Sequence, residues 1–160
     1  EAVGIQFKTP PEYIAGFAKQ LGVEYRRASH ASSQLEQVLY DPPNVGSWKG
    51  YRTWISTTTL PRRIKFAEEI LNEADNGNLT ALAKRFPNYD DPEKITERLL
   101  EYFLAKIPNE TRKQRYFDVL TAGVSASEWK SEIESDSSKS AKAIRDLIKE
   151  VIKSPDFQLS

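Results

Sequence analysis

The sequence predicts an all-α protein, an irregular bundle of about six to eight helices in one domain over residues 1–160. Apolar residues recur at the three- and four-residue spacing of amphipathic helices along most of the chain. Helix caps and stop residues delimit these stretches. Strand-like alternation occurs only around residues 51–57, so at most a minor β ribbon is expected there.

The first helix is expected over residues 10–21. Thr9 precedes two prolines and Glu12, the pattern of a hydroxyl N-cap followed by residues suited to a first helical turn. Gly22 then supplies the stop. These signals give both ends of the helix.

A second helix is expected from caps within residues 29–33 to the prolines at 42 and 43, with Leu35, Val38 and Leu39 as its apolar side chains. A third is expected from Thr58 or Thr59 to the Asn-Gly pair at 76–77, with Pro61 in its first turn. Its apolar stripe comprises Leu60, Ile64, Ala67, Ile70 and Leu71.

The rest of the chain predicts further helices over residues 79–86, from 92 onward, from 110 to 123, in a turn around Trp129, and over 139–153. The polar stretch at 134–140 is short enough to be a helix connection. Pro155 ends the last helix, and Phe157 is expected to fold back against the bundle.

Composition excludes several functional classes. Charge is balanced, with 23 basic and 23 acidic residues, so no global field attracts nucleic acid. With no Cys and one His, His30, the preferred zinc ligands are too few, and neither a metal nor another cofactor is predicted. No stretch reaches the ~18 apolar residues of a membrane span. Because the chain lacks Met, we expect it to derive from a longer polypeptide.

The most unusual segment is PPNVGSWKGYRTW at residues 42–54, an ordered loop by its prolines and glycines. One interpretation is that its rings stack on sugars or a partner while its polar groups donate hydrogen bonds. The other is that its two tryptophans fold inward and fill the core between the second and third helices. The candidate binding residues are Asn44, Trp48, Tyr51, Arg52 and Trp54.

Arg62 and Arg63 lie near the start of the third helix, where the helix dipole adds positive potential suited to an anion. The alternative is that one of them pairs with Asp41, Glu12 or Glu68 and holds the aromatic segment in place. No catalytic residue is predicted. The sequence has no Gly-x-Ser-x-Gly motif to accompany His30, for which a solvated or capping role is expected.

Three stretches carry a family resemblance: IQFKTPPEYIAGFAKQLG, DPPNVGSWKGYRTWISTTTLPRR and IKSPDFQLS. Together they resemble the C-terminal part of the bacterial family called domain of unknown function 1800. The matching positions are Lys8, Pro10 or Pro11, Glu12, Pro42, Pro43, Val45, Trp48, Gly50, Trp54, Thr59, Leu60, Arg62 or Arg63, Ser154, Pro155, Phe157 and Gln158. Ser47, Tyr51 and Asp156 depart from the family pattern.

The resemblance implies an exported bacterial protein of several hundred residues, so a periplasmic or secreted location is expected. Its expected partners are the upstream part of the same polypeptide and, as alternatives, a glycan or another exported protein, with no nucleic acid. We therefore predict a non-catalytic helical scaffold or interaction module. The alternative is carbohydrate binding, or a contribution to a polysaccharide-processing site, through residues 42–54. This segment alone is not expected to be an enzyme.

Overall fold

The computed structural model describes residues 6–38, 41 and 54–160. The all-α prediction is confirmed, since these residues form helices and no strand, with a single isolated bridge between Phe7 and Leu159. The helices are α1 Pro10–Leu21, α2 Ala28–Gln34, α3 Thr59–Glu73, α4 Asn76–Lys84, α5 Pro92–Phe103, α6 Glu110–Gly123, α7 Trp129–Glu134, α8 Ser138–Ile152 and the 3₁₀ helix η2 Pro155–Gln158.

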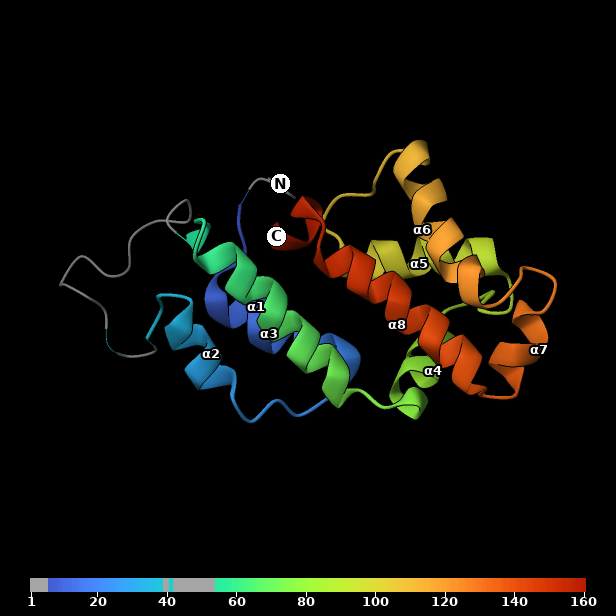
Figure 1. The fold of residues 1–160 in the computed structure, drawn as a ribbon, viewed down its shortest axis with the longest axis horizontal. Helices are drawn as coiled ribbons and strands as arrows, with labels where there is room; N and C mark the ends of the chain where they lie inside the picture. Colours follow the sequence, from blue (N-terminus) through green and yellow to red (C-terminus); the bar gives the residue numbers. More distant parts are fainter. Residues whose placement is uncertain (1–5, 39–40, 42–53) are drawn as a thin grey trace.

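Helix α8 is the centre of the bundle. It packs against α3, α4, α6 and α7, and it lies alongside α3 over much of its length (Figure 1). Its apolar face is fully buried because Ile144, Leu147 and Ile148 recur at helical spacing. Helices α1, α2 and α3 form one end of the molecule (Figure 1). The first and last described residues lie close together, since the Ser160 N–H donates to the Gln6 carbonyl at 2.8 Å.

Local capping explains the helix starts that the sequence predicted. Thr9 and Glu12 form a reciprocal capping box at α1, with the Thr9 backbone N 2.8 Å from the Glu12 carboxylate. Asp91 and Asn109 accept backbone hydrogen bonds at the starts of α5 and α6. Gly22 adopts the left-handed conformation, with φ of 69°, and ends α1.

The predicted second helix was too long. Helix α2 ends at Gln34, and Glu36 follows with φ of 67°. The N–H groups of Glu36 and Gln37 bond back to the carbonyls of Ser33 and Ser32, which is a Schellman ending. A glutamate occupies the position that glycine usually fills, so no stop signal was visible. Val38 is consequently 45% exposed, and Leu39 lies outside the described residues.

The predicted boundary between the third and fourth helices was also wrong. Helix α3 ends at Glu73, and the Asn-Gly pair at 76–77 begins α4 instead of ending α3. The reason is a capping box, in which the Asp75 carboxylate accepts from the Asn78 N–H at 2.7 Å and the Asn78 amide oxygen accepts from Asp75. The fourth helix therefore starts three residues earlier than its apolar pattern indicated.

No β ribbon forms in the described part of residues 51–57, which is 54–57. This stretch leads into α3 as a turn in which the Ser56 N–H donates to Thr59 Oγ1 at 2.8 Å. The apolar stripe of α3 also differs from the prediction. Leu60 and Ile64 are only partly buried, whereas Arg63 and Phe66 are buried.

The C-terminal segment folds back as predicted. The Phe157 side chain is 1% exposed and packs edge-on against Tyr13 and Phe17, with ring centroids 5.4 and 5.2 Å apart. The Lys8 N–H donates to the Gln158 carbonyl at 2.8 Å. These contacts bring both ends of the described chain onto α1 and beside the start of α3.

Candidate functional site

Three segments that are distant in sequence meet near the start of α3. We call this cluster the cationic junction and define it as Lys8, Tyr13, Arg63 and Phe157. Its members come from the strand-like lead into α1, from α1 itself, from the second turn of α3, and from η2. The junction therefore joins the beginning, the middle and the end of the chain.

Arg63 is the unusual member of the junction, because its side chain is fully buried. Its Nη2 donates to the Lys8 carbonyl at 2.8 Å, and its guanidinium carbon lies 4.8 Å from the centroid of the Tyr13 ring. Its Nε and Nη1 have no hydrogen-bond partner among the described residues. Burial lowers the pKa of Arg63 to about 10. A buried charge with so few partners is costly for folding.

Lys8 adds a second positive charge beside Arg63. Its Nζ donates to the Phe157 carbonyl at 2.8 Å and lies 4.4 Å from the centroid of the Phe157 ring. Burial, and then the charge of Arg63, lower the pKa of Lys8 to about 8, while the Glu12 carboxylate opposes this shift. Tyr13 is 1% exposed, and burial raises the pKa of its hydroxyl. The junction thus concentrates positive charge in a region of low polarity.

The aromatic segment is described only at its end. Asn44, Trp48, Tyr51 and Arg52 lie outside the described residues, so their binding roles stay predictions. Trp54 is half-buried, and its carbonyl accepts a hydrogen bond from the fully buried Thr59 hydroxyl at 2.9 Å. The chain is therefore fixed to α3 at the point where the segment ends.

The two predicted anion-binding arginines have different surroundings. Arg62 is exposed, and its Nη1 donates to the Gln34 carbonyl at the end of α2, 3.1 Å away. Arg63 is buried in the junction, as above. Within the described residues, both donate to backbone carbonyls, and neither forms an ion pair with Asp41, Glu12 or Glu68. Anion binding by this pair stays a prediction.

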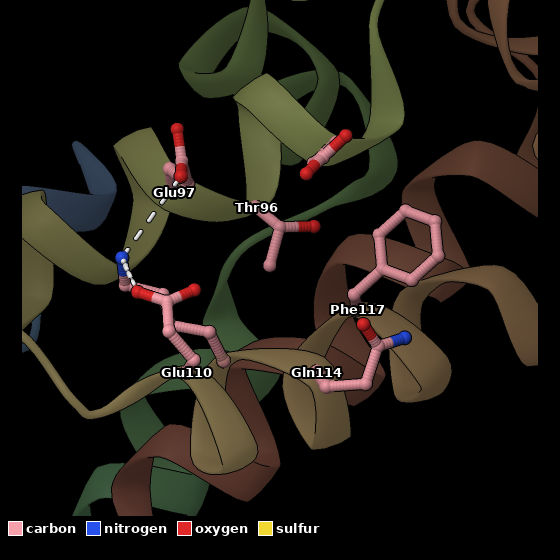
Figure 2. A pocket seen from close by; sticks show the side chains of 7 residues that line it. Thr96, Glu97, Glu110, Gln114 and Phe117 are labelled. Carbon is pink, nitrogen blue, oxygen red and sulfur yellow. Dashed lines mark hydrogen bonds and ion pairs between the residues drawn. The ribbon is translucent and has the colours of Figure 1, made fainter.

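A separate hollow of about 190 Å³ lies between α5 and α6 (Figure 2). Across its mouth, Lys113 Nζ lies 2.9 Å from a Glu110 carboxylate oxygen and 4.0 Å from one of Glu97. The Phe117 ring lies at the other end, with Thr96 and Gln114 between (Figure 2). The hollow is lined by Glu93, Thr96, Glu97, Glu110, Lys113, Gln114 and Phe117.

The described part of the chain meets the requirements of neither a metal site nor a membrane-spanning helix. It holds no group of three or more His, Cys, Asp or Glu side chains arranged to bind a metal ion. His30 is an exposed residue of α2, and its role as a solvated side chain is confirmed. None of the helices in these residues has the length and apolar character to cross a bilayer.

Sequence reasoning did not identify the partners of Arg63 or the α5–α6 hollow. Lys8 was a usable signal, since it belongs to the first of the segments that carry the family resemblance. For the hollow, the signal was the spacing of Glu93, Glu97, Glu110 and Phe117 on consecutive helices, which places these side chains along two facing edges.

The fold and the cationic junction define a class of all-α domain in which the first and last described segments of the chain meet at the start of α3. The chain belongs to the family described as Protein of unknown function (DUF1800), whose model matches residues 1–159. Comparison with curated proteins and with solved structures finds no match. The fold thus brings together Lys8 and Phe157, two positions of the resemblance, with Arg63, one of the two arginines that could match its third.

Proposed function

We propose that this domain is a non-catalytic scaffold and interaction module of an exported bacterial protein. Residues 42–54 form its contact site, and the upstream part of the same polypeptide is its partner. The location and the partner come from the family resemblance. The contact site is supported by the way the fold holds the described residues on either side of this segment.

The observation that carries the proposal is that both sides of the segment are anchored to helices. On one side, the Schellman ending of α2 leaves Leu35 fully buried. On the other, Thr59 bonds to the Trp54 carbonyl, and Arg62 links α3 to the end of α2. Binding segments held by rigid helices lose less conformational entropy on association, which favours their use as contact sites.

Surface composition beside the segment supports the same proposal. Val38 is 45% exposed on one side, and the half-buried Trp54 lies on the other. Apolar and aromatic side chains next to a cationic one are typical of interface centres. Arg62, which is exposed between α2 and α3, supplies the cation.

The test uses a double variant, Tyr51→Ala with Arg52→Ala, and measures binding to the upstream part of the polypeptide by calorimetry. We expect binding to weaken at least about tenfold, the loss of roughly 1.4 kcal/mol or more that truncated interface anchors usually produce. The control is Arg26→Ala with Glu24→Ala, an exposed pair elsewhere on the surface. Unchanged affinity in a folded double variant would refute the contact site.

Carbohydrate binding, or a contribution to a polysaccharide-processing site, is the second candidate. The half-buried indole of Trp54 supports it, because a partly open ring is suited to stacking on a sugar. Iodide quenching of tryptophan fluorescence, with and without cello-, xylo- and chito-oligosaccharides, tests it. Trp129 is fully buried and gives a constant background. If no oligosaccharide alters quenching or emission, this candidate fails and the scaffold proposal is unaffected.

A further inference from the structure

The hollow in Figure 2 is part of a longer groove between α5 and α6. A second hollow of about 70 Å³ adjoins it, lined by Glu97, Leu100, Glu101, Ile107 and Lys113. Because Glu97 and Lys113 line both hollows, the two adjoin along the helix pair. We call the combined surface the α5–α6 groove.

We propose that the α5–α6 groove binds a segment of a partner protein in which a lysine or arginine lies close to an apolar residue. This surface is separate from residues 42–54 and extends the proposed function. It does not depend on the contact site proposed above. Charge, shape and exposed apolar area each point to this occupant.

The charge of the groove favours a cation. Four carboxylates line it: Glu93, Glu97, Glu101 and Glu110. Lys94 pairs with Glu97 at 3.5 Å and Arg98 with Glu101 at 2.7 Å, so Glu93 is the lining carboxylate without an ion pair in the described chain. Lys113 is engaged with Glu110 and Glu97 at the junction of the two hollows. The hydrogen bond that Lys113 donates to the Glu110 carboxylate, and the negative charges of Glu110, Glu97 and Glu101, raise the pKa of Lys113. The groove therefore already stabilises one cation.

Negative charge remains beyond Lys113. Glu93 is exposed and forms no ion pair within the described chain. It lines the same hollow as the half-buried ring of Phe117. An incoming lysine or arginine would lay its aliphatic stem on this ring and direct its charged end to the Glu93 carboxylate.

The size of the first hollow fits one long side chain. Its volume of about 190 Å³ corresponds to roughly six waters at ~30 Å³ each. Drug-sized ligands usually occupy sites of about 300 Å³ or more. Figure 2 shows Thr96 and Gln114 between the Glu97–Glu110 end and Phe117. Thr96 Oγ1 donates to the Pro92 carbonyl and Gln114 Nε2 to Asp118, so their oxygens are the atoms left to accept from a bound side chain.

Exposed apolar surface distinguishes a protein segment from a free amine. Ile107 is 53% exposed at the second hollow, whose wall includes the buried Leu100. A polyamine has no branched apolar group to cover an isoleucine, whereas a peptide carries apolar and basic side chains a few residues apart. The groove offers a surface to each of these two side chains. Ile107 in the second hollow would contact the apolar one, and Phe117 in the first would contact the stem of the basic one.

The test is an NMR titration of the ¹⁵N-labelled chain with capped synthetic pentapeptides that hold one lysine and one leucine at varied spacing. We expect saturable shifts of Glu97, Ile107, Gln114 and Phe117 for at least one spacing. Replacing the peptide lysine by norleucine should weaken binding at least about tenfold, and replacing its leucine by serine about threefold. Weak affinity is expected for so small an area, so peptide is added up to about 5 mM.

Two variants of the protein locate the site. Glu93→Gln with Glu97→Gln should weaken peptide binding about fivefold, and Ile107→Ser about threefold, because all three side chains are surface groups whose loss leaves the core intact. The matched control, Glu128→Gln with Glu134→Gln, alters two carboxylates near α7 and should leave binding unchanged.

Three results would overturn the proposal. One is the absence of saturable shifts for every spacing. A second is that spermidine produces the same shifts with equal affinity and Ile107→Ser has no effect, which would identify the groove as a site for free amines. Loss of binding in the α7 control would equally argue against the groove, because it would show a response to overall charge.

Discussion

An arginine lies near each end of α3, Arg63 of α3 itself at the N-terminal end and Arg145 of α8 at the C-terminal end. The two arginines are in opposite electrostatic surroundings. At the C-terminal end, Arg145 of α8 donates from Nη1 to the Leu71 carbonyl and from Nη2 to the Ala74 carbonyl, both at 2.7 Å. The final carbonyls of a helix lack intrahelical partners and carry the negative end of the dipole. The Leu71 carbonyl also accepts from the Ala74 N–H at 3.2 Å, so Arg145 adds a charged donor there, supplies a donor to the Ala74 carbonyl, and stabilises the fold.

At the N-terminal end, Arg63 lies within the positive half of the same dipole. It is fully buried, makes one hydrogen bond to the Lys8 carbonyl, and has Lys8 itself as a cationic neighbour. Its contact with the Tyr13 ring compensates only part of the desolvation. The comparison teaches that the same residue type contributes to stability at one end and opposes it at the other.

The largest effect is expected for Arg145→Met. Two charge-assisted hydrogen bonds to helix-end carbonyls are lost, which should lower the free energy of unfolding by about 2–3 kcal/mol. Urea denaturation measures this change. Lys142→Met is the control on the same helix, where the lost partner is the exposed Asp146, and it should change stability by less than about 0.5 kcal/mol. Equal losses of stability in both variants would show that the two hydrogen bonds of Arg145 do not stabilise the end of α3.

The next largest expected effect is a dependence of the free energy of unfolding on pH, caused by Lys8. Burial and Arg63 lower the pKa of Lys8 from 10.5 to about 8. Between these values the unfolded chain binds more protons than the folded one, so stability rises with pH. We expect a gain of about 1–2 kcal/mol between about pH 7.5 and 9.5, below the range in which tyrosines with raised pKa values reverse the trend.

Urea denaturation across this pH range checks the rise, with Lys8→Met as the control. The variant should show a flatter profile, because the group whose pKa differs between the folded and the unfolded chain has been removed. A wild-type profile that is flat or falls from pH 7.5 to 9.5 would show that Lys8 does not lie in a cationic, desolvated site.

A smaller effect is expected at the turn that leads into α3. Thr59→Val keeps the shape of the side chain but removes the acceptor for Ser56 N–H and the donor to the Trp54 carbonyl. Stability should fall by about 1 kcal/mol, the usual net value when such hydrogen bonds are lost. Trp54 should also quench more readily with iodide. Thr58→Val is the control, since Thr58 is exposed and its side chain makes no capping bond.

The smallest effect, and the sharpest test, is expected for Arg63→Met. Removal of an unpaired buried charge offsets loss of the bond to Lys8, so stability should change by less than about 1 kcal/mol despite complete burial. The rise of stability with pH should also move to higher pH, since the charge that lowers the pKa of Lys8 is gone. If Arg63→Met lowered the free energy of unfolding as much as Arg145→Met, the two arginines would contribute equally to stability and the contrast between the ends of α3 would be wrong.

Sequence patterns located the helices whose signals are local. Thr9, Asp91 and Asn109 were identifiable caps because capping depends on residues two or three positions away. The end of α2 was missed because Glu36 adopts the left-handed conformation without being glycine. The Asn-Gly pair at 76–77 was misplaced because a stop signal and a helix start use similar residues.

The candidate site was predictable only in part. Arg63 was singled out by its place near a helix start, but its partners Lys8 and Phe157 are far away in sequence, and no local pattern relates them. Helical spacing separates Arg62 from Arg63, because Arg63 lies four residues before Ala67 and seven before Ile70 on the buried face of α3. The packing of α1 against α3 then buries Arg63 and leaves Arg62 at the surface.

The sequence by itself determined the all-α class, most helix starts and the apolar face of α8, because helix periodicity and capping act within a few residues. The tertiary structure alone decided that the two ends of the chain meet over α3, that one arginine is buried beside a lysine, and that α5 and α6 enclose an acidic groove. These features depend on which helix faces come together, and that choice is made by the packing of the whole core.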